Sequence, residues 1–485
     1  MSTPEQPSAP ADSTTNSSNR KPKVIIAGGG LGGLTLAILL HKANIDFEVL
    51  ERAKEVKPLG SAVGLGIGVA ALFKQMDLYD DFVQIGKQHT RLQIFNETLA
   101  PEFAMEYAFL EGMTNCKEYL VSRADLYDVL WRHCPRDQIH LSKKITDYDQ
   151  DDEGVTVRCA DGSTYRGDIL VGADGAYSVV RTQLYEKLKE QNKLPASDAE
   201  PLPFSNVCLV GQTRVLDPEE FPSLKSKESQ FLSVLGIENM YTWTTLTTKS
   251  DTICWAVVAY LEKESSKADE SFCNSEWGPE AAESMCQEVR DFKVPGGKDG
   301  KVLTMGDIID LTPKDLISKV MLEEKVFDTW YSGRTVLIGD ACHKMNPSGG
   351  VGALNAMFDA VTIANWISTL ESSSVSDLDV IFKEYHAERY PVAQAAYARS
   401  KMFAYNLGKS WISVFVRAVM RRLPEFLMKR LAITQLAAVR PQVSFLPLVE
   451  DKASIPKSDQ PSLHKTLAIH KARAAKPSQS NDVAV

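Results

Sequence analysis

The sequence predicts an α/β fold in which a Rossmann-like domain carries an inserted β-sheet domain and is followed by a helical region. Three patterns lead to this prediction: a strand, a glycine-rich turn and a helix at the start of the chain, alternating strand patterns in its middle, and helical periodicity after Asp340. The predicted boundaries are 1–21 for a disordered tail, 22–185 together with 327–372 for the first domain, 186–326 for the second domain, 373–448 for the C-terminal helices and 449–485 for a second disordered tail.

The composition is typical of a folded protein that acts on small molecules. The chain has 485 residues, more than one core usually holds, and 44% are hydrophobic and 24% charged. Its net charge of -9 does not indicate a nucleic-acid-binding protein, so no nucleic-acid partner is expected. The eight cysteines are scattered, so neither a metal site nor a disulfide framework is expected. No signal peptide or spanning apolar run is recognisable, which makes the cytoplasm the expected compartment.

The opening elements are predicted by β-branched residues at Lys23–Ala27 and by helical spacing of apolar residues over Leu31–Lys42. The run between them satisfies GxGxxG through Gly28, Gly30 and Gly33. The first glycine permits the turn, the second lets a pyrophosphate approach the backbone, and the third lets helix and strand pack closely. The free N–H groups and the dipole of the helix N-terminus favour a phosphate there.

Glu51 follows the next predicted strand, Phe47–Leu50, at the position where a carboxylate accepts hydrogen bonds from both hydroxyls of the adenosine ribose. A dinucleotide with a free 2′-hydroxyl is therefore expected. The motif itself leaves FAD and NAD open, since both share the ADP half.

The remaining elements follow from local patterns. Further strands are expected at 154–159, 168–172 and 334–338 in the first domain, and at 231–235, 240–247 and 252–260 in the second. The helical region is expected to comprise 352–370, 380–407 and 410–437.

Two later motifs decide between the cofactors. Gly172-Ala173-Asp174-Gly175 follows a strand and continues as GADGxxSxVR, and the stretch from Gly333 to Pro347 reads GRxVLxGDxxHxxxP. Together with GxGxxG and Glu51, these motifs make the chain resemble the class A FAD-dependent monooxygenases of the para-hydroxybenzoate hydroxylase type. The resemblance is strongest to fungal salicylate hydroxylase-like and meroterpenoid or indole-diterpene epoxidase-like enzymes. It implies that the two predicted domains are a FAD-binding domain and a substrate domain.

The resemblance also implies which side chains hold the cofactor. Asp340 would bond the ribityl chain of FAD, although an acid there could also cap a helix. Arg123 would contact the cofactor, or lie on the surface at the start of a helix. Asp174 would stabilise a turn or contact FAD directly. His343 fits the motif without an expected chemical role.

Main-chain contacts with the flavin are implied for Gly64, Gly352 and Ala353. The last two stand at a helix N-terminus, which would stabilise negative charge on the reduced ring. Leu354 occupies the position where the family usually has Asn, with Asn355 one position later. Contacts on that side of the ring are therefore expected to differ.

The activity that the resemblance implies is that of a monooxygenase of secondary metabolism. NADPH or NADH would bind transiently and reduce the FAD, since no second GxGxxG is present. Reaction with O2 would give a flavin C4a-hydroperoxide that hydroxylates or epoxidises a small aromatic, polyketide or terpenoid substrate. Two alternatives remain open: a FAD-dependent reductase or dehydrogenase without oxygen insertion, and a catalytically idle FAD-binding protein that recruits partners.

For the substrate side, Tyr241 and Arg214 are the candidate catalytic residues, because the family's pocket is lined from the inserted sheet. Alternating aromatics in strands can equally be ordinary core. Between residues 411 and 431, apolar and basic side chains combine. This pattern is compatible with a peripheral membrane contact, which would favour a lipophilic substrate, or with helices packed over the substrate domain.

Overall fold

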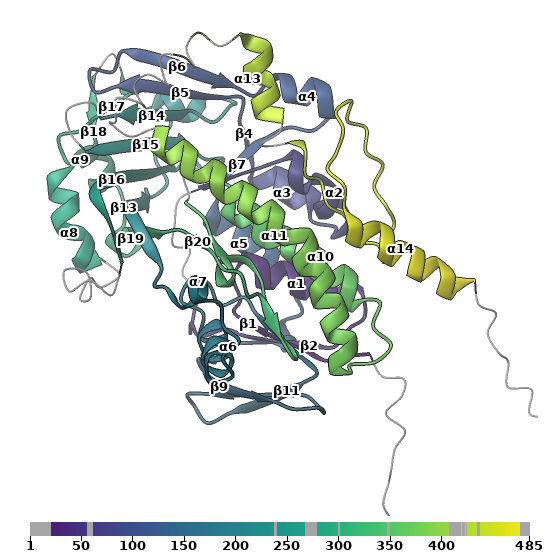
Figure 1. Ribbon diagram of the computed structural model, residues 1–485. Helices are drawn as coiled ribbons and strands as arrows, with labels where there is room; N and C mark the ends of the chain where they lie inside the picture. Colours follow the sequence, from purple (N-terminus) through teal and green to yellow (C-terminus); the bar gives the residue numbers. More distant parts are fainter. Residues whose placement is uncertain are drawn as a thin grey trace, which may run out of the picture.

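Two sheets, joined by a smaller one and covered by long helices, make up the molecule (Figure 1). The structure is a computed structural model, and it describes residues 21–55, 62–236, 240–266, 279–298, 301–346, 350–406, 419, 422, 424–433 and 437–475. The predicted N-terminal tail lies outside these residues except for Lys21.

The first sheet has six strands in the order β21-β22-β12-β1-β2-β8. Its members are β1 (Val24–Ala27), β2 (Phe47–Leu50), β8 (Ile139–His140), β12 (Ile169–Gly172), β21 (Tyr331–Ser332) and β22 (Thr335–Leu337). The pairs from β22 to β8 are parallel, and β1 and β12 are completely buried, as expected for a sheet covered on both faces. Helix α1 (Leu31–Lys42) has the predicted bounds and packs against α10 (Gly352–Ile367).

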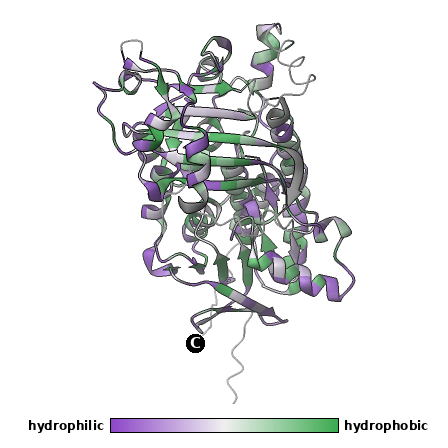
Figure 2. Ribbon diagram, turned by 90° about the vertical axis from the view of Figure 1, so that its left-hand side faces the viewer, coloured by the Kyte–Doolittle hydropathy of each residue, from purple (hydrophilic) through white to green (hydrophobic). Residues whose placement is uncertain are grey.

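The second sheet has seven strands in the order β19-β13-β16-β15-β14-β5-β6. Their bounds are β5 (Arg91–Asn96), β6 (Pro101–Glu106), β13 (Pro203–Gln212), β14 (Phe231–Leu235), β15 (Tyr241–Thr247), β16 (Ile253–Ser266) and β19 (Ser318–Glu323). Helices α8 (Pro279–Glu288) and α9 (Met305–Asp310) contact each other on one side of this sheet, which Figure 2 shows face-on in the upper half of the molecule. We call that side the outer face and the opposite side the inner face.

Strands β5 and β6 correct the predicted domain boundary. They fall within 22–185, which we expected to form only the first domain, yet β5 pairs in parallel with β14 and β6 pairs with β5. Their apolar side chains Leu92, Ile94 and Met105 join Leu235 in one buried cluster. The second sheet is therefore built from two separate parts of the chain.

A three-stranded sheet connects the two larger ones. It consists of β3 (Ala62–Leu65), β4 (Lys87–Gln88) and β7 (Tyr119–Ser122), and Leu120 of β7 packs against Leu246 and Cys254 on the inner face. The other helices of this half of the chain are α2 (Ile67–Gln75), α3 (Tyr79–Ile85), α4 (Phe109–Thr114), α5 (Arg123–His133), α6 (Val179–Glu190) and α7 (Ala196–Ala199). The sheet β9 (Ile145–Gln150), β10 (Val155–Cys159) and β11 (Thr164–Gly167) is separate.

The C-terminal part contains α11 (Val375–Asn406), α13 (Glu425–Ala432) and α14 (Pro461–Ala474). The prediction that 449–485 is disordered is wrong for 449–475, because α14 packs on α10 and α11. Gln460 holds this segment through hydrogen bonds with Gln442, a bond partner that the local sequence does not indicate. Most of the predicted helix 410–437 lies outside the described residues.

Candidate functional site

The glycine-rich turn has the geometry that a bound diphosphate requires. Gly28 has φ +103°, and a Cβ there would lie 2.5 Å from the carbonyl oxygen of Ala173. A Cβ at Gly33 would lie 2.1 Å from the carbonyl oxygen of Gly28. At Gly30, by contrast, a Cβ would meet no described protein atom within 4 Å. The turn is thus closed toward the protein and open where a phosphate would approach.

Glu51 is held beside this turn by two backbone donors. Its Oε2 accepts from the N–H of Gly29 over 2.8 Å, and its Oε1 accepts from the N–H of Ala53 over 2.9 Å. Each carboxylate oxygen keeps a further lone pair for a ligand. The arrangement therefore fits an acid that receives two ribose hydroxyls.

Asp340 lies in the turn after β22 and forms an ion pair with Lys344, Nζ to Oδ2, at 2.6 Å. Burial opposes ionisation of this carboxyl, but Lys344, His343 and Arg123 outweigh that effect and hold its pKa below the usual value. The exposed Arg123 at the start of α5 is thus close enough to act on Asp340 electrostatically. Two of the predicted cofactor residues, far apart in sequence, share one region.

Asp174 has the turn-stabilising role that we considered for it. Its Oδ2 accepts from the N–H groups of Val179 and Val180 at the start of α6. Its Oδ1 is buried and has no hydrogen-bond partner in the described part of the protein, and burial raises the pKa of the carboxyl. A direct contact with FAD stays a proposal.

The main-chain positions lie at the edges of the same region. Gly64 is in β3, paired with Leu120 of β7. Gly352 and Ala353 begin α10, and a Cβ at Gly352 would meet no described atom within 4 Å. Asn355 points away from this opening, because its Nδ2 donates to the Val351 carbonyl and its Oδ1 accepts from Arg389. Asn355 therefore does not take the place of the asparagine that the family usually has at the position of Leu354.

The two candidate catalytic residues do not meet. Tyr241 lies on the outer face, where the centroid of its ring is 5.2 Å from that of Phe292. Burial and the neighbouring Glu288 raise the pKa of its hydroxyl. Arg214 is exposed beyond the end of β13. Tyr241 is in register, through β16, with Val207, which stands seven residues before Arg214, or about 23 Å of extended chain. This geometry speaks against a joint catalytic role.

Several inner-face residues were not singled out from the sequence. Ser233 and Thr244 share a hydrogen bond of 3.0 Å, and the buried Thr242 Oγ1 has no described partner. The buried His89 lies near them at 5.3 Å from the Phe231 ring, and burial lowers its pKa to about 4. Strand alternation predicts two faces, but only the packing of Leu120 in β7 against Leu246 and Cys254 shows which one turns inward.

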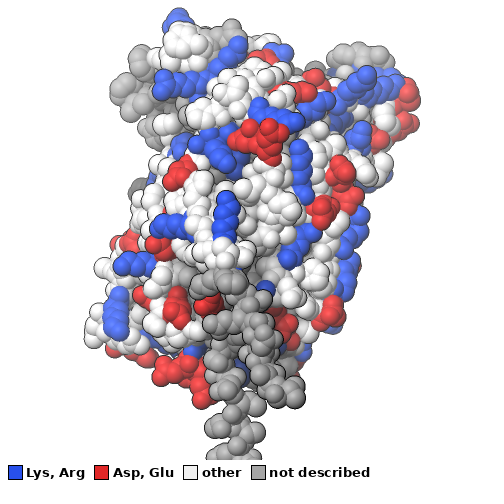
Figure 3. Space-filling model, turned by 90° about the vertical axis from the view of Figure 1, so that its right-hand side faces the viewer, with Lys and Arg blue, Asp and Glu red and all other residues white. Residues whose placement is uncertain are grey.

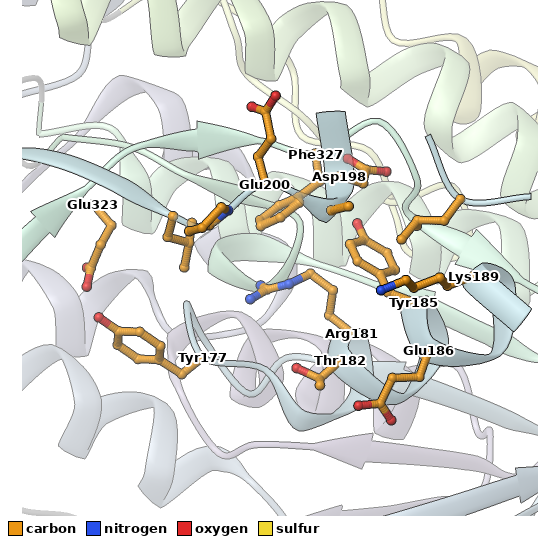
Figure 4. A pocket seen from close by; sticks show the side chains of 14 residues that line it. Tyr177, Arg181, Thr182, Tyr185, Glu186, Lys189, Asp198, Glu200, Glu323 and Phe327 are labelled. Carbon is orange, nitrogen blue, oxygen red and sulfur yellow. The ribbon is translucent and has the colours of Figure 1, made fainter. Parts of the chain in front are cut away.

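A separate cleft of about 370 Å³ lies beside α6 (Figure 4). Tyr177 and Arg181 line it from the segment after Gly172-Ala173-Asp174-Gly175, Asp198 and Glu200 from α7 and its C-terminal end, and Glu323 from the end of β19. Glu323 is 1% exposed, and burial raises its pKa to about 7. In Figure 4, Glu323 and Tyr177 stand at one end of the cleft and Lys189 at the other.

Comparisons with known proteins give concordant results. A family model described as FAD binding domain matches residues 21–313 and 303–400. The FAD-dependent monooxygenase paxM of Penicillium paxilli is 30% identical over 401 residues, which cover 78% of this chain and 77% of paxM. The FAD-dependent monooxygenase ausM of Penicillium brasilianum is 28% identical over 410 residues, 79% of each chain.

Solved structures share the fold. HpxO of Klebsiella pneumoniae, solved with FAD and uric acid, superposes with a TM-score of 0.66 at 20% identity, over 86% of this chain and 97% of that chain. CtdE, solved with FAD and a substrate, superposes with a TM-score of 0.62 at 16% identity, over 81% and 90%.

Proposed function

Because this chain belongs to the FAD-binding domain family of FAD-dependent monooxygenases, we propose that it uses NAD(P)H and O2 to hydroxylate or epoxidise a small aromatic, polyketide or terpenoid substrate. The protein is an oxidoreductase, and its cofactor is FAD. The cited relatives are matched over more than half of both chains, so the whole catalytic unit is comparable.

One observation carries the proposal: the predicted cofactor segments meet around α10. A Cβ at Gly32, beside the glycine-rich turn, would lie 3.2 Å from the Cβ of Ala356, and a Cβ at Gly339, beside Asp340, would lie 2.9 Å from it. The diphosphate turn, the Asp340 turn and the first turns of α10 are thus packed together. This arrangement supports one extended site for a dinucleotide that carries a flavin.

Bound FAD would supply the electron transfer and the reaction with oxygen. The chain would contribute position and charge. Glu51 would orient the ribose, Asp340 would accept hydrogen bonds from the ribityl chain, and the N–H groups at the start of α10 would favour negative charge on the ring. We propose that the residues that contact or position FAD are Gly28, Gly30, Gly33, Glu51, Gly64, Arg123, Asp174, Asp340, Gly352 and Ala353.

The inner face supports a mostly apolar substrate. Leu92, Ile94, Met105 and Leu235 form an apolar cluster there. The hydroxyls of Ser233 in β14 and of Thr242 and Thr244 in β15 are short polar groups on the same face. A ligand with an extended hydrocarbon skeleton and a few oxygen functions would match this combination better than a highly charged one.

The deciding experiment is anaerobic reduction of the purified yellow protein by NADPH or NADH, followed by mixing with O2 and candidate substrates. Incorporation of one atom of ¹⁸O2 into product, detected by mass spectrometry, is the expected result. Reduced flavin that returns to the oxidised form without oxygenated product, with every substrate class, would favour the reductase alternative. Bound FAD that no nicotinamide reduces would favour the idle, partner-recruiting alternative.

For the peripheral membrane contact, we propose α13 as the described part that would touch a lipid surface. Phe426 is 66% and Leu427 39% exposed, and Lys429 and Arg430 stand in the last turn of the same helix. Lys and Arg side chains are frequent along the upper part of the face in Figure 3. No helix in the described ranges combines the length and apolar character that crossing a bilayer requires. Flotation with anionic liposomes, compared with Lys429→Glu/Arg430→Glu, tests the contact, and equal flotation would remove it.

A further inference from the structure

Asp359 is a completely buried carboxylate in the middle of the apolar helix α10. It accepts three hydrogen bonds from two segments of the chain: the N–H of Gly339 at 2.8 Å and Nε2 of His343 at 2.6 Å in one turn, and Nε of Arg389 at 2.7 Å on α11. The side chain of Asp359 is 0% exposed and that of Arg389 is 4% exposed. Burial opposes ionisation, but His343 and Arg389 outweigh that effect and keep the pKa of Asp359 below its usual range.

Arg389, on α11, reaches a second residue of α10. One of its terminal nitrogens donates to Oδ1 of Asn355 over 2.8 Å, and Asn355 in turn donates to the Val351 carbonyl before the helix over 2.9 Å. A second contact from α11 joins the same region, since the hydroxyl of Ser400 donates to the Asn346 carbonyl over 2.6 Å. Helix α11 therefore holds both ends of the segment that leads from Asp340 to the start of α10.

We propose that Arg389 is a positioning residue for the flavin. Through Asp359 it fixes the turn that carries Asp340, and through Asn355 it fixes the N-terminus of α10, so it sets the FAD affinity and the reduction potential of the bound flavin. The inference rests on the proposed contacts of Asp340 and α10 with FAD. The hydrogen bonds of Arg389 within the described structure go to Asp359 and Asn355, so its influence on the cofactor passes through them.

Stability alone is a weak explanation for such a network. Removing two charges from water costs about as much as their attraction returns, so an apolar pair of similar shape would serve a core equally well. An ion pair with directed hydrogen bonds does, however, fix the orientation of the groups that it joins. Of the three donors to Asp359, two belong to the turn from Gly339 to His343, next to the acid proposed to bind the ribityl chain.

A metal ion is not the reason for this cluster. Cys342, His343 and Asp359 place possible ligand atoms within 4.8 Å of one another. However, the carboxylate is already bonded to the guanidinium of Arg389, and the thiol of Cys342 donates to the carbonyls of Leu337 and Gly339. A cation there would lie beside a fixed positive charge.

The test compares Arg389→Gln and Arg389→Lys with the wild-type holoenzyme and with Arg334→Lys as the matched control. Arg334 is equally buried, at 2% exposed, but it precedes β22, and its guanidinium donates to the backbone carbonyls of Asp151, Asp168 and Ser373. For each protein, FAD affinity is measured by titrating the apoprotein, the flavin potential against a reference dye, and the melting temperature with and without FAD.

Arg389→Gln is expected to weaken FAD binding roughly tenfold or more, because Asp340 and the N-terminus of α10 would no longer be held in position. The flavin potential should become more negative, because a displaced helix N-terminus stabilises the negative charge of the reduced ring less. Arg389→Lys restores the charge beside Asp359 and should recover part of both. Arg334→Lys should lower only the melting temperature. If Arg389→Gln lowers the melting temperature but matches the control in FAD affinity and potential, the proposal is wrong.

Should Arg389→Gln fail to fold, Asn355→Ala leaves the ion pair with Asp359 intact and removes the side-chain hydrogen bonds that link Arg389 to the N-terminus of α10. An unchanged potential in that folded variant would also overturn the proposal. Wild-type protein that takes up no FAD would instead contradict the proposed function, so the two failures are distinguishable.

Discussion

The backbone N–H of Gly29 donates a hydrogen bond of 2.8 Å to Oε2 of Glu51. The acid that is proposed to bind the ribose is therefore tied to the turn that is proposed to bind the diphosphate. Ribose and diphosphate are adjacent in FAD, so one displacement should affect both.

Glu51→Gln should weaken FAD binding by about tenfold, since an amide is a poorer acceptor than a carboxylate and its NH2 group would face a backbone N–H. Titration of the apoprotein with FAD measures the change. Glu48→Gln, in the strand β2 that precedes Glu51 but paired with Lys23, is the control and should bind FAD normally. Equal affinities of the two variants would argue against the ribose contact.

Gly28→Ala and Gly30→Ala should fail in different ways. At Gly28 an added methyl would press on the Ala173 carbonyl at a positive φ, so the apoprotein itself should lose stability. At Gly30 the methyl meets no described atom, so the apoprotein should melt normally and bind FAD more weakly. Melting curves with and without FAD separate the two effects, and a normal FAD affinity in Gly30→Ala would exclude a phosphate there.

The sequence predicts well what depends on neighbours in the chain. The strand β2 and the helix α1 have their predicted bounds because apolar spacing, the glycine turn and the following acid all act within about thirty residues. The candidate flavin contacts were also accessible from motifs. The motifs indicate which residues are candidates for cofactor contacts, but they do not indicate which distant residues hold these candidates in position.

What the sequence could not supply depends on distant partners. The sequence analysis does not single out Asp359, although the single charged residue in a mostly apolar helix is a signal for a buried charge pair. Likewise, β5 reads as a strand only together with β14, more than a hundred residues later. The face on which Tyr241 lies could not be predicted for the same reason, because alternation defines two faces and packing with Phe292 decides which one is covered.

Tyr241→Phe should change kcat and KM by less than about twofold, because removing one half-buried hydroxyl from the outer face alters nothing on the inner face. Thr242→Val, on the inner face, should raise KM or change the position of oxygenation with little loss of stability, since its hydroxyl has no described partner to lose. Steady-state kinetics and product analysis with an accepted substrate check both. A large effect of Tyr241→Phe alone would reverse our assignment of the faces.

Glu323 should make stability depend on pH. Its folded-state pKa of about 7 lies above the ordinary 4.5, so the folded protein binds the proton more tightly. The contribution is complete below pH 4.5 and is lost as pH rises through about 7, by up to about 3 kcal/mol. Glu323→Gln should remove this loss, so denaturant unfolding at pH 5 and pH 8 should show the variant gaining on wild type at the higher pH. A constant difference would contradict the raised pKa.

Gln460→Ala should destabilise the protein by roughly 1–3 kcal/mol, because it leaves the buried N–H and carbonyl of Gln442 without their partners. Lys465→Ala, whose side chain is 52% exposed in an ion pair with Glu384, should cost less than about 1 kcal/mol. Thermal unfolding measures both. Similar losses would mean that the packing of α14, rather than the buried bonds, holds the segment.

The side chain of Gln75 bonds the backbone of Val443, 368 residues further along the chain. During synthesis on the ribosome, the N-terminal glycine turn therefore exists long before the segment that closes over its domain has emerged from the exit tunnel. Cofactor loading should accordingly be a late event, completed after translation of the C-terminal helix. A ribosome-stalled nascent chain that ends before residue 437 should capture FAD poorly, even though it contains every motif residue proposed to touch the cofactor.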